Sequence, residues 1–163
     1  MKDYPYYIAG EFKKSKERLT AINPSNEEEF AFFYETTFED LELTLVKAKE
    51  AQRIWQQISF LERAKVLRQI NQVILENISS LAELETKEIG KPLKESLFVD
   101  IPLGADCFNY YAGLLETISS EKYETQSGID IIEFEPFGLN AVFLPYNVPL
   151  MIFGFACAAS LAS

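Results

Sequence analysis

The sequence predicts an α/β fold: short β-strands, then a helical region, then the start of an incomplete parallel sheet. Three observations predict it. Aromatic runs bounded by turn residues occupy positions 4–34. Apolar residues at helical spacing, with capping patterns, fill the middle of the chain. A nearly uniform apolar run at 139–144 precedes a proline-rich turn and an apolar helix, which together form the first half of a βαβ unit.

Composition narrows the function classes. The chain has 163 residues, a length typical of one domain, and a formal charge of −10. It has no histidine, which excludes Ser-His-Asp and Cys-His hydrolase sites and most zinc-site patterns. The acidic balance disfavours nucleic acid and anionic membranes as partners. Two cysteines, Cys107 and Cys157, give no disulfide framework and no metal site, and with no signal peptide they favour a cytoplasmic location.

The N-terminal elements are predicted from turn residues. Tyr6–Ile8 forms a short strand that ends at an Ala9-Gly10 turn. Asn23–Asn26 is a second turn, and Phe30–Tyr34 is a strand rich in aromatic residues.

The helical region is predicted from its boundaries. Three patterns in which a Ser or Thr is followed three residues later by an acidic residue predict helix starts: Thr37 with Asp40, Ser59 with Glu62, and Ser80 with Glu83. Gly90 is expected to end the third helix and Pro92 to begin the next. Pro102 and Gly104 are expected to kink or divide the helix that follows.

The last part of the chain has a different pattern. Residues 129–135 predict a strand, and residues 139–144 predict a strand covered on both faces, within which Asn140 would need a buried hydrogen-bond partner. The final 28 residues carry no charge. Because the apolar segment Val148–Ala162 is shorter than a membrane-spanning helix, we expect it to form a helix buried in protein.

The turn between this strand and helix is the most informative place. Asn147 lies between Pro145 and Pro149, where loop and helix N-terminal NH groups of α/β sheets converge on ligands. Its amide could donate a hydrogen bond to a developing oxyanion. Alternatively, Asn147 only caps the helix. The chain contains no glycine-rich phosphate loop.

Six groups of residues, in order along nearly the whole chain, resemble the N-terminal third of the NAD(P)-dependent aldehyde dehydrogenase superfamily. They are Tyr7–Phe12, Ile22–Ser25, Glu39–Trp55 with Glu62-Arg63, Leu84–Glu95 with its Gly-Lys-Pro, Asn109–Gly113, and Glu135–Gly138 together with Pro145–Leu150.

The resemblance implies a Rossmann-like oxidoreductase that oxidises an aldehyde to an acid with NAD or NADP. In that family a cysteine thiolate attacks the aldehyde, a hydride passes to the cofactor, and water activated by a glutamate hydrolyses the thioester. The residue matching Asn147 donates its amide to the oxyanion. Leu144, Pro145, Tyr146 and Asn147 would lie along the cofactor.

The resemblance also defines what we expect to be missing. Residues 1–163 correspond to the N-terminal portion of the family's cofactor-binding domain, with a strand near 129–135 that resembles its oligomerisation arm. The nucleophile, the base and the catalytic domain would follow Ser163, so the chain alone is expected to be inactive, as a gene fragment, a split subunit or a truncated chain. Expected partners are the aldehyde substrate and either identical subunits or a complementary C-terminal polypeptide. The alternative is a noncatalytic interaction fragment that pairs with a full-length homologue or a separate C-terminal subunit.

Three positions depart from the family pattern. Ala156 stands where a lysine is usual, Tyr146 replaces the commoner tryptophan, and Asn140 interrupts the apolar strand. Cys107 and Cys157 do not match the nucleophile and are expected to pack in helices.

Overall fold

A computed structural model describes residues 1–163. Five strands form the N-terminal part: β1 (Lys2–Tyr4), β2 (Tyr6–Ile8), β3 (Glu11–Lys13), β4 (Arg18–Asn23) and β5 (Glu28–Tyr34). They make a three-stranded sheet in the order β1-β5-β4 and a β2–β3 hairpin. In the sheet, β1 runs parallel to β5 and β4 runs antiparallel to it.

Turn chemistry explains these elements and confirms the predicted ones. Ala9 and Gly10 take positive φ angles of 50° and 91° and close the β2–β3 hairpin. Asn23 Oδ1 accepts a hydrogen bond from the Ser25 backbone NH at 3.0 Å, which forms the turn between β4 and β5.

The first two long helices begin where the sequence predicts. Helix α1 (Phe38–Trp55) has Thr37 as its N-cap, whose side chain accepts from the Asp40 NH at 3.1 Å. Helix α2 (Phe60–Glu76) begins with a complete Ser59–Glu62 capping box.

The predicted start of the third helix is wrong. Helix α3 (Ile78–Ile89) follows α2 almost directly, with Asn77 between them. Ser80 lies inside the helix, where its hydroxyl donates to the Asn77 carbonyl at 2.9 Å instead of capping. The helix ends at Gly90, in the left-handed conformation expected there.

After Pro92 a nearly continuous helical segment changes type. A short helix α4 (Leu93–Glu95) leads into a π-helical turn η1 (Ser96–Asp100) and then α5 (Ile101–Thr117). The prediction that Pro102 and Gly104 divide the helix is wrong in place: the change to π geometry lies before them, and α5 continues through both residues. Pro102 lies in the first turn of α5, where its missing NH costs little.

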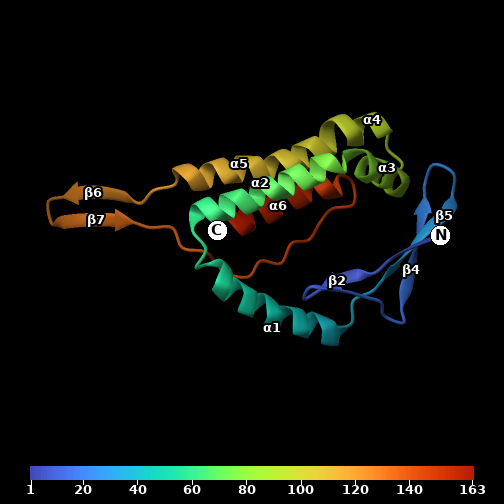
Figure 1. Ribbon diagram of the computed structural model, residues 1–163, viewed down its shortest axis with the longest axis horizontal. Coiled ribbons are helices and arrows are strands. Elements are labelled where there is room, and N and C mark those ends of the chain that lie inside the picture. The colour runs from blue at the N-terminus through green and yellow to red at the C-terminus, as the bar shows by residue number, and fades with distance from the viewer.

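A β-hairpin extends away from the helices (Figure 1). It pairs β6 (Glu121–Thr125), which the sequence analysis missed, with β7 (Gly128–Ile132), and every residue in both strands is exposed. The predicted strand at 129–135 is thus confirmed over 129–132 and wrong at 133–135.

The predicted strand at 139–144 is wrong. Residues 133–148 contain no helix or strand, and the only parallel pairing in the structure is that of β1 with β5. A strand exists only where a neighbour accepts its hydrogen bonds, and no strand lies beside this segment. Asn140 is exposed and donates to the Gly138 carbonyl at 3.1 Å, so it needs no buried partner.

Helix α6 (Pro149–Ala162) closes the fold by packing against α5 and α2 (Figure 1). Gly104 of α5 and Gly154 of α6 touch directly, since a Cβ atom on Gly154 would lie 2.1 Å from the Gly104 carbonyl oxygen. The core of this bundle centres on Phe108, Leu67 and Ile101. Helix α6 is buried on this side only, because Phe155 remains 46% exposed. None of the helices has the length and apolar character that a bilayer-spanning segment requires.

Candidate functional site

The turn that precedes α6 presents Asn147 at the N-terminus of that helix. Val148 is the N-cap residue and has no side-chain capping bond, and Pro149 lies in the first turn. The Asn147 side chain is exposed and makes no hydrogen bond within the chain. The alternative that Asn147 caps α6 is therefore wrong, and its amide NH₂ is available to a ligand.

Lys91 holds the backbone of this turn. Its ammonium donates to the Asn147 carbonyl oxygen at 3.1 Å and forms ion pairs with Glu85 Oε1 at 2.6 Å and with Asp100. Glu85 lies on α3, Lys91 follows Gly90, and Asp100 ends the π turn η1. Three segments of the chain thus converge beneath the turn.

This charged group is almost fully buried. The side chains of Lys91, Glu85 and Asp100 are 10%, 4% and 5% exposed, and the Ser96 hydroxyl donates to Glu85 at 3.3 Å. Burial alone would lower the pKa of Lys91, but the hydrogen bonds and charges of Asp100 and Glu85 outweigh it and raise that pKa above its ordinary value. Lys91 therefore remains an ammonium ion at neutral pH.

The position of Asn147 suits stabilisation of negative charge. The first NH groups of α6 have no helical partner, and the positive end of the helix dipole lies there. The first hydrogen bond within the helix is from the Ile152 NH to the Val148 carbonyl. An oxyanion beside the Asn147 amide would meet a donor in a field of favourable sign.

The three other predicted site residues form an apolar approach to this turn. Leu144 and Tyr146 are 45% and 90% exposed, and Pro145 between them is exposed as well. Leu144 also lines a cavity of about 300 Å³ between α3 and the start of α6, together with Leu150 and Phe153. These residues fit one apolar wall of a cofactor site, while no glycine-rich loop is present to bind phosphate groups.

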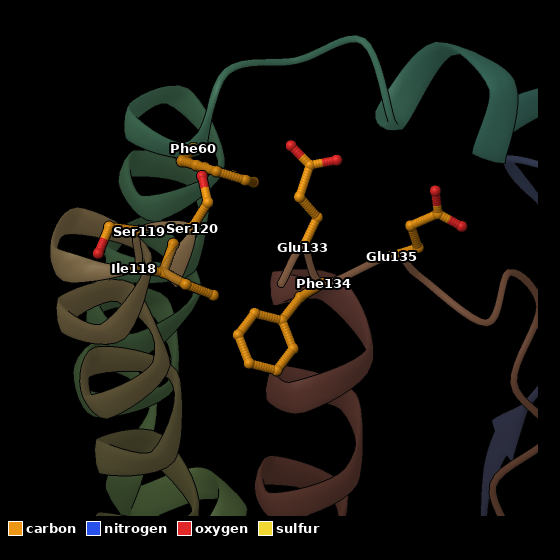
Figure 2. A pocket seen from close by; sticks show the side chains of 7 residues that line it. All are labelled: Phe60, Ile118, Ser119, Ser120, Glu133, Phe134 and Glu135. Atoms are coloured by element: carbon orange, nitrogen blue, oxygen red, sulfur yellow. The ribbon is translucent and has the colours of Figure 1, made fainter. Parts of the chain in front are cut away.

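Neither a second pocket nor the acidic and cysteine side chains of the chain form a catalytic or metal site. Figure 2 shows a pocket at the other end of the bundle in which the Phe134 ring points toward the helices, while Glu133 and Glu135 point away from it. Ser119 and Ser120 also line this pocket, but neither hydroxyl is hydrogen-bonded to Glu133 or Glu135. No group of three or more His, Cys, Asp or Glu side chains is arranged to hold a metal ion.

The cysteines are packing residues, as predicted. Cys107 and Cys157 are half-buried against the bundle core. Burial raises the pKa of both thiols, and Cys107 donates to the Leu103 carbonyl at 3.2 Å. Neither thiol is activated as a nucleophile. Ala156, at the position of the usual lysine, is half-buried on α6.

The sequence predicts Asn147 as a site residue, but it does not predict the charged group whose Lys91 bonds to the Asn147 carbonyl. In sequence, Lys91 and Glu85 stand out only as members of the motif Leu84–Glu95, and Asp100 belongs to no motif. The only local signal was the unusual setting of a lysine between a helix-ending glycine and a proline.

Comparisons with known proteins show the family and the fold of this chain. A model of the aldehyde dehydrogenase family matches residues 12–163. A variant of the aldehyde dehydrogenase from Bacillus cereus shares 27% identity with a TM-score of 0.90, over 97% of this chain and 33% of that one. PnpE from Pseudomonas sp. WBC-3 shares 26% identity with a TM-score of 0.89, over 99% of this chain and 34% of that one.

A third solved structure contains a bound cofactor. It is a variant of the indole-3-acetaldehyde dehydrogenase AldA from P. syringae in complex with NAD⁺ and IAA, with 25% identity and a TM-score of 0.90 over 97% of this chain and 33% of that one. The chain spans about a third of the length of each of these enzymes.

Proposed function

The chain belongs to the aldehyde dehydrogenase family, and from this premise we propose that it supplies the oxyanion-binding turn and one wall of the cofactor site of an NAD(P)-dependent enzyme that oxidises an aldehyde to a carboxylic acid. The observation that carries the proposal is the Asn147 side-chain amide, which has no partner within the chain and is presented at the start of α6 on a backbone held by Lys91. The NAD⁺ complex of the P. syringae enzyme supports the choice of cofactor.

In this proposal Asn147 acts on the oxygen of the substrate. When a thiolate attacks the aldehyde carbon, the carbonyl oxygen gains a full negative charge, and the Asn147 NH₂ donates a hydrogen bond to it. Removing such a donor costs two to three orders of magnitude in comparable sites, so this hydrogen bond would supply roughly 3–4 kcal/mol of the catalysis. When bound, the nicotinamide ring accepts the hydride that leaves the same carbon.

Leu144, Pro145 and Tyr146 would line the path of the cofactor. An apolar wall excludes water from the reacting carbon, which strengthens the hydrogen bond from Asn147. The binding of the phosphate groups falls to residues outside this chain, because the chain has no glycine-rich loop.

We also propose that the 163-residue chain has no activity alone. Both of its cysteines are packed in the bundle with raised pKa values, and it has no histidine. The nucleophile and the base that activates water would come from residues outside these 163, which correspond to the other two thirds of the relatives' length.

The test compares the chain alone with an assembly. The chain is purified alone, and it is also co-expressed with the C-terminal two thirds of the Bacillus cereus enzyme, and aldehyde-dependent formation of NADH and NADPH is followed in both samples. We expect no turnover by the chain alone and turnover by the assembly. Turnover by the isolated chain would overturn the proposed inactivity, and an assembly that forms but remains inactive would count against the proposed role.

A second candidate function is a noncatalytic interaction fragment. The observation that favours it is the β6–β7 hairpin, whose residues are all exposed and include Ile129 and Ile131 at 55% and 62%. A two-stranded hairpin is marginally stable by itself and gains stability by joining another sheet. Co-purification followed by mass spectrometry tests it: a full-length homologue bound to the chain supports this function, and a monomer without a partner contradicts it.

A further inference from the structure

Residues 145–147, just before the N-cap residue of α6, are tied to the rest of the protein by a single hydrogen bond. That bond joins Lys91 Nζ to the Asn147 carbonyl oxygen at 3.1 Å. The preceding residues 139–147 are exposed and belong to no helix or strand. The orientation of the turn therefore depends on α6 on one side and on Lys91 on the other.

We propose that Lys91 is a positioning residue, whose ammonium is held by Glu85 and Asp100 and fixes the backbone of Asn147 so that the Asn147 amide points to the substrate oxygen. The role given to the amide rests on the proposed function. The clamp, by which we mean Lys91 held by Glu85 and Asp100 and bonded to the Asn147 carbonyl, does not rest on that function, because all of its atoms are present in this chain.

The three hydrogens of the ammonium match the three acceptors. A lysine ammonium has three donors and no acceptor, and here they meet Glu85, Asp100 and the Asn147 carbonyl. An ammonium held by two buried carboxylates has little freedom to move. The Lys91 nitrogen that donates to the Asn147 carbonyl is therefore fixed in position. A positioning device needs this rigidity, because small displacements of a catalytic donor weaken its action.

The clamp is also built on rigid elements. Gly90 takes a φ of 81° and lies against Pro24, since a Cβ atom on Gly90 would come within 2.7 Å of the Pro24 ring. This contact fixes the residue before Lys91 against the turn between β4 and β5. Glu85 lies within α3, and Asp100 lies in a π turn, a feature found often at functional sites.

The first experiment measures the mobility of the Asn147 backbone by NMR and needs no enzymatic activity. The full chain is labelled with ¹⁵N at its asparagines, and the Asn147 signals are identified by their loss in Asn147→Gln. In Lys91→Gln we expect the backbone signal of Asn147 to shift and its heteronuclear NOE to fall to the level of a free loop. The signals of Asn77 and Asn109, which lie in the helical bundle, stay in place. Lys13→Gln, which removes the ion pair of Lys13 with Asp40 on another part of the surface, is the matched control and leaves Asn147 unchanged.

Lys91→Gln leaves two buried carboxylates without a counter-ion and could unfold the chain. The triple variant Glu85→Gln, Lys91→Gln, Asp100→Asn removes all three charges and covers that case. A folded variant with a mobile Asn147 supports the proposal. A folded variant in which Asn147 is unchanged overturns it, and so does loss of every asparagine signal in both variants, which would make Lys91 a residue of general stability only.

The second experiment uses the active assembly. A positioning role predicts that Lys91→Gln lowers kcat with little change in KM, and that it adds no further loss when Asn147 is already alanine. Equal additional losses in both backgrounds would overturn the proposal. If Asn147→Ala has no effect at all, the proposed function fails, while the ¹⁵N measurement still decides whether Lys91 holds the turn.

Discussion

At the scale of single residues, the side chain and the backbone of Asn147 have different roles. The Asn147 amide makes no hydrogen bond within the chain, and the bond that fixes this residue goes to its carbonyl oxygen. Its side chain can therefore be changed without breaking the clamp. Substitutions at Asn147 should affect chemistry far more than folding.

The first prediction concerns this side chain. In the assembly of the chain with a complementary C-terminal polypeptide, Asn147→Ala should lower kcat by roughly 10²–10³-fold, because the oxyanion loses its donor. The thermal unfolding of the isolated chain should change little. Asn140→Ala is the matched control, since the Asn140 amide bonds only to the nearby Gly138 carbonyl. Steady-state kinetics decide, and a similar loss in both variants would remove Asn147 from the reaction.

The second prediction concerns the buried charges. The pKa of Lys91 is raised above 10.5 in the folded chain, so its ion pairs contribute their full stabilisation below about pH 10.5 and lose it as the pH rises through the folded-state pKa. The free energy of unfolding should therefore fall at alkaline pH. In Asp100→Asn the ammonium keeps only one carboxylate, so this fall should be smaller.

Urea titrations from pH 8 to pH 11 measure this loss in the free energy of unfolding. Asp130→Asn, on the exposed β7 strand, is the control and should lose as much stability as the unchanged chain. An alkaline loss of the same size in Asp100→Asn would contradict the ionic account of the cluster.

At the scale of elements, the contact between α5 and α6 determines the position of the candidate site. Helix α6 carries Asn147 at its N-terminal end, and it approaches α5 closely because Gly104 and Gly154 have no side chains there. The backbone atoms on both sides leave no space for a methyl group. The position of the site thus depends on two glycines that take no part in binding.

The third prediction tests this contact. Gly154→Ala would place a Cβ atom 2.1 Å from the Gly104 carbonyl oxygen, so the helices must separate, at a cost of about 1–3 kcal/mol or more. Gly113→Ala, on the facing helix α5, meets nothing within 4 Å and should stabilise the chain by up to about 1 kcal/mol through helix propensity. Urea denaturation measures both. Equal effects of the two substitutions would mean that the close crossing does not exist.

Elements fixed by local chemistry were predictable from the sequence. The caps at Thr37 and Ser59 and the stop at Gly90 depend on residues within one turn of each other, and all three are confirmed. The pattern at Ser80 is just as local, yet wrong. A serine can bond to a carbonyl of its own helix as well as cap a new one, and the spacing to Glu83 does not distinguish the two.

Elements that depend on distant partners were not predictable in the same way. The run 139–144 has the composition of a buried strand, but a strand is defined by its neighbours, and here it has none. Lys91 likewise differs from the exposed Lys94 in sequence only by its setting between a helix-ending glycine and a proline, which does not reveal its ion-pair partners. Only the folded chain brings Glu85 and Asp100 to it, through the end of α3 and the π turn. The turn at Asn147 was predictable because Pro145 and Pro149 flank it in the sequence, whereas the contacts of Lys91 depend on the folded chain.

At the scale of the whole molecule, the chain exposes far more surface than its mass requires. A compact monomer of 18.6 kDa would expose roughly 8,200 Å², whereas this structure exposes 11675 Å². The difference exceeds the share that one partner contributes to an obligate interface, roughly 1,000–2,500 Å². Much of it lies on the projecting β6–β7 hairpin and the extended segment 133–147 (Figure 1), where large apolar side chains such as Phe143 are exposed.

The last prediction follows from this surface. The isolated chain should self-associate, because exposed apolar side chains and unpaired strand edges favour association over solvation. Ile129 and Ile131 lie on one face of β7, two residues apart. Replacing both by lysine should shift the chain toward monomer if that face is a main contact. Asp130→Lys, on the opposite face of the same strand, controls for the added positive charge and should leave association unchanged. Size-exclusion chromatography with light scattering measures the mass in each case, and a monomeric unchanged chain with cooperative unfolding would show that the excess surface needs no partner.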